Sequence, residues 1–180
     1  MNKLTQIQLG FLVLLSIVSC SPTLTYLSND MIKDNKWSQE DLKKIQFYLS
    51  DDIILTRTIS NGESTIESGK IKIKNGKKID QVIFKKGTPG ILMFLPKEDR
   101  FAISFDNSSP EKYLIFGPNP KMDSRYALMA KEWDRYSGQV SYNGQIFETA
   151  SHSAFSALLV NLKRAKKIER NREIAKGNKI

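Results

Sequence analysis

A repeated Asn-Gly turn signal is the feature that most constrains the fold of this chain. Each pair lies between short runs of β-branched and aromatic residues, and Asn-Gly favours the two-residue hairpin turn with positive φ at both central positions. The three pairs are Asn61-Gly62, Asn75-Gly76 and Asn143-Gly144. Gly- and Pro-containing segments at 87–90, 107–110 and 117–120 supply further breaks. This series of turns and breaks predicts an antiparallel β-meander.

The runs between the turns have the length and composition of strands. The expected strands are 45–49, 53–59, 65–74, 79–86, 91–95, 101–105, 112–116, 125–133, 138–142 and 145–149. Residues 50–52 suit a bend or bulge that joins the first two into one long strand. Alternation places Phe101, Ile103 and Phe105 on one face of their strand.

About nine or ten short strands in one domain predict a mainly β fold. An open sheet would expose an apolar face and two edges, so we expect a small antiparallel β-barrel or a two-layer sandwich, and we favour the barrel. A transmembrane barrel is disfavoured because its strands need about 9 to 11 residues, and most runs here are shorter and contain charged residues.

A short helix is expected before the first strand. Ser38 can cap it, Asp41 stands at the third helical position, and Trp37 and Leu42 occupy the positions of a hydrophobic staple. The helix must end early because strand-forming residues begin at Ile45.

The amino terminus has the pattern of an export signal. Lys3 precedes an apolar run that ends at Cys20, and this run is shorter than the roughly 20 residues that span a bilayer. Within it, Ile17-Val18-Ser19-Cys20 resembles the lipobox of bacterial lipoproteins, with Ile17 at the position where leucine is usual. The resemblance implies cleavage before Cys20 and acylation of its sulfur, which would anchor the chain in a membrane. The alternative is a buried helix with a core cysteine.

The resemblance defines a domain plan and a location. We expect a signal peptide at 1–19, an acylated amino terminus and tether at 20–36, a β-domain at 37–162 and a basic tail at 163–180. Ser21 after the cysteine resembles the outer-membrane class of lipoproteins, so the expected location is the bacterial envelope, at the outer membrane facing the periplasm. Two or three acyl chains make such attachment practically permanent. Since Cys20 is the only cysteine, disulfides and cysteine-based metal or thiol chemistry are excluded once it is acylated.

The net charge of +9 is concentrated at the carboxyl terminus. The segment 163–180 holds eight Lys or Arg residues against two Glu, so the body is nearly neutral once Lys3 is removed with the signal. We expect this tail to bind anionic lipid, lipopolysaccharide phosphates or an acidic envelope protein, or else to act as a solubilising end. Nucleic acid is excluded by export. The candidate residues are Lys163, Arg164, Lys166, Lys167, Arg170 and Arg172.

The segment before the tail allows two structures. Residues 157–162 suit a closing strand, whereas Phe155, Leu158, Leu162 and Ala165 also satisfy helical spacing. We favour a strand that runs out into the tail.

Evidence for catalysis is weak. His152 lies between Ser151 and Ser153, but neighbours on a strand point to opposite faces, so they rarely form a nucleophile and its base. The carboxylates fall mostly in turns, where an Asp side chain commonly hydrogen-bonds to nearby backbone groups. They are Asp51, Asp52, Glu98, Asp99, Asp106 and Asp123. No cofactor or metal motif is found in the sequence.

One cluster in the body combines aromatic and basic residues and could bind a sugar or a protein partner, although core pairing is the commoner outcome. Its members are Arg125, Lys131, Trp133, Arg135, Tyr136 and Tyr142. We therefore predict a non-enzymatic interaction or structural lipoprotein. The alternatives are an envelope hydrolase acting on glycan or peptide, and a carrier of an apolar ligand inside the barrel.

Overall fold

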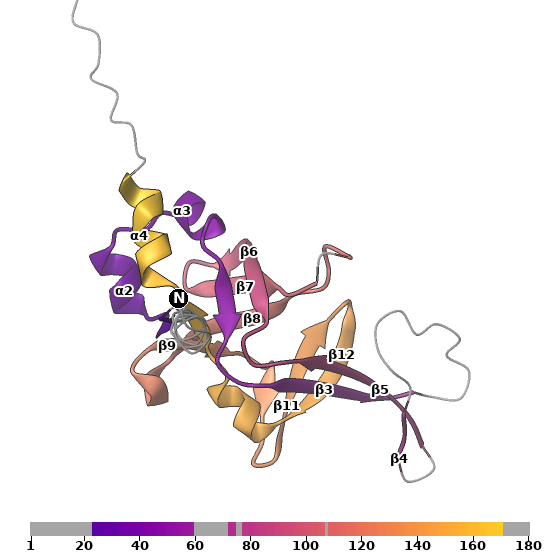
Figure 1. Ribbon diagram of the computed structural model, residues 1–180. Helices are drawn as coiled ribbons and strands as arrows, with labels where there is room; N and C mark the ends of the chain where they lie inside the picture. The colour runs from indigo at the N-terminus through magenta and orange to yellow at the C-terminus, as the bar shows by residue number, and fades with distance from the viewer. Residues whose placement is uncertain (1–22, 60–71, 75–76, 107, 171–180) are drawn as a thin grey trace, which may run out of the picture.

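Two antiparallel sheets with short helices at one end make up the computed structural model of this protein (Figure 1). The structure describes residues 23–59, 72–74, 77–106 and 108–170. Within these ranges the chain is mainly β, with antiparallel pairing throughout, as the turn pattern predicts.

The first sheet has seven strands, and short strands at the two ends of the chain lie together at one of its edges. In spatial order they are β1 (Thr25–Tyr26), β13 (Leu158–Val160), β2 (Phe47–Leu49), β6 (Pro89–Lys97), β7 (Arg100–Ser104), β8 (Leu114–Asn119) and β9 (Arg125–Leu128).

The second sheet has six strands and extends away from the helices. In spatial order they are β10 (Glu132–Trp133), β11 (Ser137–Tyr142), β12 (Gln145–Ala150), β3 (Ile53–Thr58), β5 (Lys77–Phe84) and β4 (Lys72–Lys74). The helices are α2 (Asn29–Asp34), α3 (Gln39–Lys43) and α4 (Leu162–Arg170), with 3₁₀ turns η1 (Pro120–Met122) and η2 (Ser151–Phe155).

The Asn143-Gly144 turn is confirmed. It joins β11 to β12, with φ of 50° at Asn143 and 68° at Gly144, as the tight hairpin turn requires. Tyr142 and Gln145 face each other directly across it. The other two pairs, Asn61-Gly62 and Asn75-Gly76, lie outside the described residues.

The predicted capping box is also confirmed. The Asp41 backbone N–H donates to the Ser38 hydroxyl at 3.3 Å, and the Ser38 N–H donates to the Asp41 carboxylate at 2.9 Å. The staple residues Trp37 and Leu42 are both buried in the main apolar cluster. This cap starts α3 at the predicted place.

Aromatic side chains fill the inner face of the seven-stranded sheet. Phe101 and Ile103 are fully buried, and Phe105 packs against the same cluster. Ala102 and Ser104 between them are buried as well, so burial in β7 does not alternate. Phe101 meets Phe47 edge-on, at 6.3 Å between ring centroids. Phe84 of β5 contacts Phe105 at 5.6 Å and so joins the cores of the two sheets.

The chain changes sheets at short bends. It leaves β2 for β3 at 50–52, which we expected as a bend or bulge within one strand, and it returns from β5 to β6 at 85–88. The single strand predicted over 125–133 is wrong. After Leu128 the chain bends, and Lys131 donates its N–H to Gln139, so β10 joins the other sheet.

A buried polar junction fixes two of these bends against each other. The Ser50 N–H donates to the Ala157 carbonyl at 2.9 Å, and the Ala157 N–H donates to the Ser50 hydroxyl at 2.9 Å. The Ser156 hydroxyl donates to the Asp51 carbonyl at 3.1 Å. Ser50, Ser156 and Ala157 are all buried. We call these four residues the Ser50–Ala157 junction.

The seven-stranded sheet curls without closing into a continuous hydrogen-bonded barrel among the described residues. Its last strand, β9, returns toward the opposite edge through two isolated bridges, Ser28 to Arg125 and Ala127 to Ala157. A mainly β body of two antiparallel sheets is therefore established, and a closed barrel is not.

Both ends of the described chain differ from the expected domain plan. The expected tether at 20–36 contains β1 and α2, and Leu27 between them is fully buried. The expected basic tail begins as α4, with Ala165 buried in the core cluster. The ambiguous segment at 155–170 is both strand and helix, because β13 ends at Val160 and α4 starts two residues later.

We expect Ser50→Ala to destabilise the protein. It leaves the buried Ala157 N–H without its acceptor, which costs about 1–3 kcal/mol of unfolding free energy. Urea unfolding would measure this as a lower midpoint at unchanged slope. The matched control is Ser141→Ala on an exposed β11 position, which should stay within about 0.5 kcal/mol of wild type. Equal stability of the two variants would contradict a role for the junction.

Candidate functional site

The basic candidates at the carboxyl end lie on α4. Lys163, Arg164, Lys166 and Lys167 are exposed, while Ala165 turns into the core. Arg170 ends the helix, and its side chain is outside the described part, as are Arg172 and the predicted acylation site Cys20. The first half of the expected polycation is therefore a helix packed on the body.

The two ends of the described chain meet at one sheet edge. Thr25 of β1 pairs with Val160 of β13, and the strands are antiparallel. The residues before Thr25 therefore continue in the same direction as those after Val160, where α4 starts. Figure 1 shows α2, α3 and α4 gathered at this end of the molecule.

The second candidate, His152, is exposed on η2. It lines a cavity of about 390 Å³ together with Ser137, Glu148 and Ser153. The Ser153 hydroxyl is buried and accepts from Thr149 at 2.9 Å. Across the described ranges, His152 makes no hydrogen bond to a hydroxyl or carboxylate, so the structure brings these groups to one cavity without assembling a nucleophile and its base.

The candidate carboxylates are spread over separate turns and serve local contacts. Asp52 accepts from the Lys85 ammonium at 2.7 Å, and this bond is the first cause of its lowered pKa. Asp99 pairs with its neighbour Arg100 at 3.3 Å. Asp51, next to Asp52, lies in the Ser50–Ala157 junction, and Glu98, next to Asp99, is exposed in the β6–β7 turn. Asp123 lies in another turn and pairs with Arg125 at 3.6 Å.

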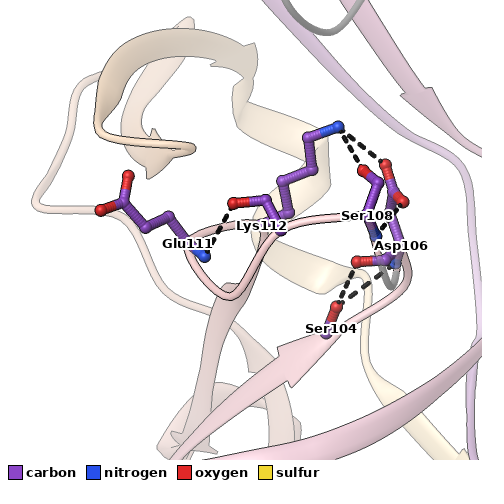
Figure 2. Close-up of polar contacts among 6 residues, drawn as sticks. Ser104, Asp106, Ser108, Glu111 and Lys112 are labelled. Atoms are coloured by element: carbon purple, nitrogen blue, oxygen red, sulfur yellow. Dashed lines mark hydrogen bonds and ion pairs between the residues drawn. The ribbon is translucent and has the colours of Figure 1, made fainter.

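The sixth carboxylate, Asp106, belongs to a polar cluster that the sequence analysis missed. Figure 2 shows the Lys112 side chain reaching across the β7–β8 loop, where its ammonium donates to Ser108 Oγ at 2.7 Å and to Asp106 Oδ2 at 3.1 Å. The Asp106 N–H in turn donates to Ser104 Oγ at 3.3 Å. The Lys112 side chain is only 10% exposed. We call Ser104, Asp106, Ser108 and Lys112 the Lys112 cluster.

The Lys112 cluster contains a Ser–Lys contact, but the lysine is shared. Besides the Ser108 hydroxyl, its ammonium donates to the Asp106 carboxylate, so Lys112 ties two residues of the loop together. The Ser108 N–H also donates to Asp106 at 2.9 Å and is the first cause of the lowered pKa of Asp106. These contacts hold the β7–β8 loop closed.

The aromatic and basic cluster of the sequence analysis does not form a single surface. Tyr142 is buried and lies edge-on to Phe84 and Phe147, and burial raises its pKa to about 12. Trp133 covers Gly138 on the neighbouring strand. The other members point elsewhere: Arg125 lies over Tyr26, Arg135 lies over the exposed Tyr136, and Lys131 is exposed.

A cavity of about 690 Å³, which we call the helix-side cavity, opens between α2, α3 and the end of the β6–β7 hairpin. Its apolar lining includes Trp37 and Phe101, and its rim carries charged residues. Trp37 is 6% exposed, and its indole Nε1 is buried with no hydrogen-bond partner in the described structure. The staple pattern gives no sign of this second position of Trp37, because the cavity is built by segments far apart in the chain.

Comparison with protein-family models, curated proteins and solved structures finds no match to this chain. Among the described residues, no group of three or more His, Cys, Asp or Glu side chains is placed to hold a metal ion. No helix in the described ranges combines the length and apolarity needed to cross a bilayer.

The lowered pKa of Asp106 predicts a loss of stability in acid. A carboxylate whose folded pKa lies below its unfolded value of 3.8 stabilises the fold above that value, and this contribution disappears as pH falls through the folded pKa. Asp106→Asn removes the charge at every pH. The difference in unfolding free energy between wild type and Asp106→Asn should therefore shrink from pH 6 to pH 2. A difference that is the same at both pH values would contradict the electrostatic role of the Lys112 cluster.

Proposed function

We propose that this protein is an acyl-anchored lipoprotein of the bacterial envelope whose helical end lies against an anionic membrane surface. Its anchor is Cys20, and its electrostatic contacts come from α4 and the basic residues that follow, Arg170 and Arg172 among them. The expected place is the periplasmic face of the outer membrane. The body acts as a non-enzymatic interaction module held at that surface.

The observation that carries this proposal is the pairing of Thr25 with Val160. Cys20 is five residues before Thr25, and five residues span at most about 17 Å. An acylated Cys20 would therefore hold this sheet edge close to the bilayer. Since α4 starts two residues after Val160, the same anchor brings the basic helix to the headgroups.

The charge of the helical end supports the same orientation. Exposed basic side chains outnumber exposed acidic ones on and beside the three helices. The basic ones are Lys33, Lys36, Lys43, Lys44, Lys163, Arg164, Lys166 and Lys167, and the acidic ones are Asp30, Asp34 and Glu40. Each basic residue close to an anionic surface contributes about 1 kcal/mol of binding free energy. The lipid would supply permanent attachment, and the helices would set the orientation.

The two alternative functions have less support. A hydrolase needs an activated nucleophile. His152 makes no hydrogen bond to a hydroxyl in the described ranges, and the lysine that contacts Ser108 also donates to Asp106. A carrier needs an unfilled barrel interior, whereas Phe47, Phe101 and Phe116 fill the inner face of the larger sheet. We infer a sandwich-like body rather than a closed barrel.

Vesicle binding tests the proposal. In the full chain carrying Cys20→Ser, so that no acyl group contributes, α4 should promote binding to phosphatidylglycerol vesicles. Changing Lys163, Arg164, Lys166 and Lys167 to Gln should lower the partition coefficient between about tenfold and about 1,000-fold, since each residue contributes about 1 kcal/mol or less. The loss should fade at high salt and on phosphatidylcholine vesicles.

The matched control removes the same charge elsewhere. Lys78, Lys86, Lys121 and Lys131 are exposed and belong to other elements, so changing these four to Gln should alter binding far less than the α4 variant does. Equal losses in the two quadruple variants would show that only net charge matters. That result would remove α4 from the membrane face.

A further inference from the structure

We infer that the helix-side cavity binds the headgroup and upper acyl region of a zwitterionic phospholipid bearing a primary amine, of the phosphatidylethanolamine type. The inference rests on the proposed membrane face, because the cavity opens between two of the helices that would lie against the bilayer.

A buried, unsatisfied donor belongs to a residue that lines the cavity. Trp37 Nε1 has no acceptor in the described structure, and leaving such a donor unpaired is costly. Asn29 also lines the cavity, and its Oδ1 accepts from the Tyr126 hydroxyl at 2.7 Å, so its amide N–H₂ is the group left to donate. A ligand with ester carbonyl or phosphate oxygens would supply acceptors to these two residues.

One wall of the cavity is apolar. Ile32, Leu42 and Leu95 line the same cavity and pack on the core cluster beside Phe101. A hydrocarbon segment next to the ester would bury against them. The volume of about 690 Å³ is within the range of small-ligand sites, which are about 300–1,000 Å³.

The rim of the cavity carries charges of both signs. Lys33 and Lys97 present ammonium groups, and Glu98 presents a carboxylate. All three are exposed and make no ion pair in the described part of the chain, whereas Asp99 beside them pairs with Arg100. Two cations and one carboxylate at the same opening match a ligand that carries a phosphate and an ammonium group. A purely anionic headgroup leaves Glu98 unmatched, and a fatty acid leaves both Glu98 and one lysine unmatched.

Tryptophan fluorescence of the full chain tests the site. Trp133→Phe leaves Trp37 as the sole tryptophan, and Cys20→Ser removes the acyl group. Short-chain dihexanoyl phosphatidylethanolamine, added below its micelle concentration, should change Trp37 emission saturably at a stoichiometry of one. Lys97→Glu should weaken this binding about tenfold, or 1.4 kcal/mol. The control is Lys121→Glu, an equal charge reversal on the exposed η1 turn, which should leave binding unchanged.

A second arm tests the headgroup. Dihexanoyl phosphatidylglycerol lacks the amine, so the parent should bind it more weakly than the ethanolamine lipid, and Glu98→Gln should abolish that preference. The inference is overturned if Trp37 emission does not saturate, if Lys97→Glu binds like the control, or if phosphatidylglycerol binds more tightly. Because this assay uses monomeric lipid, its outcome does not depend on binding to a vesicle surface. Lost cavity binding with intact α4-dependent vesicle binding would overturn the cavity alone, and the reverse result would overturn the membrane face alone.

Discussion

The Ser50–Ala157 junction is the contact on which the arrangement of the two sheets depends. Two bends of the chain, more than 100 residues apart, meet here, and the buried backbone groups of Ser50, Ser156 and Ala157 must find partners within the protein. The Ser50 and Ser156 hydroxyls supply the bonds that strand ladders cannot provide at a bend. With the bends fixed, β2 and β13 pair in one sheet while β3 and β12 pair in the other.

This constraint also determines what the ends of the chain can do. Because β13 is held beside β2, its other side accepts β1, and Thr25 at the start of β1 lies opposite Val160, two residues before α4. The basic helix α4 therefore lies at the same end of the molecule as α2 and α3 (Figure 1), and these two helices contribute residues to the helix-side cavity. The six-stranded sheet extends away from that end, with Ile54, Ile83 and Ile146 exposed on its outer surface. An interaction module held at a membrane by the first end would present this second sheet to its surroundings.

Local signals in the sequence predicted most of the fold. The Asn143-Gly144 turn and the Ser38 cap depend on neighbouring residues alone, and both are found where expected. The division of 125–133 between two sheets was missed because a sheet change depends on distant partners such as Gln139. The same reason hides the candidate sites: Lys112 becomes part of a cluster only when the β7–β8 loop folds back, and Trp37 lines a cavity only when α2, α3 and β6 meet. Strand periodicity also could not show that residues 25–36 and 162–170 pack on the body.

The central claim is that the helical end of this domain is tied to a membrane through Cys20. The most direct test is the intact mass of the protein extracted from the membranes of its own cells. The account predicts a chain that begins at Cys20 and carries the added mass of two or three acyl chains. A species that begins at Met1, or one in which Cys20 is a free thiol, would contradict it.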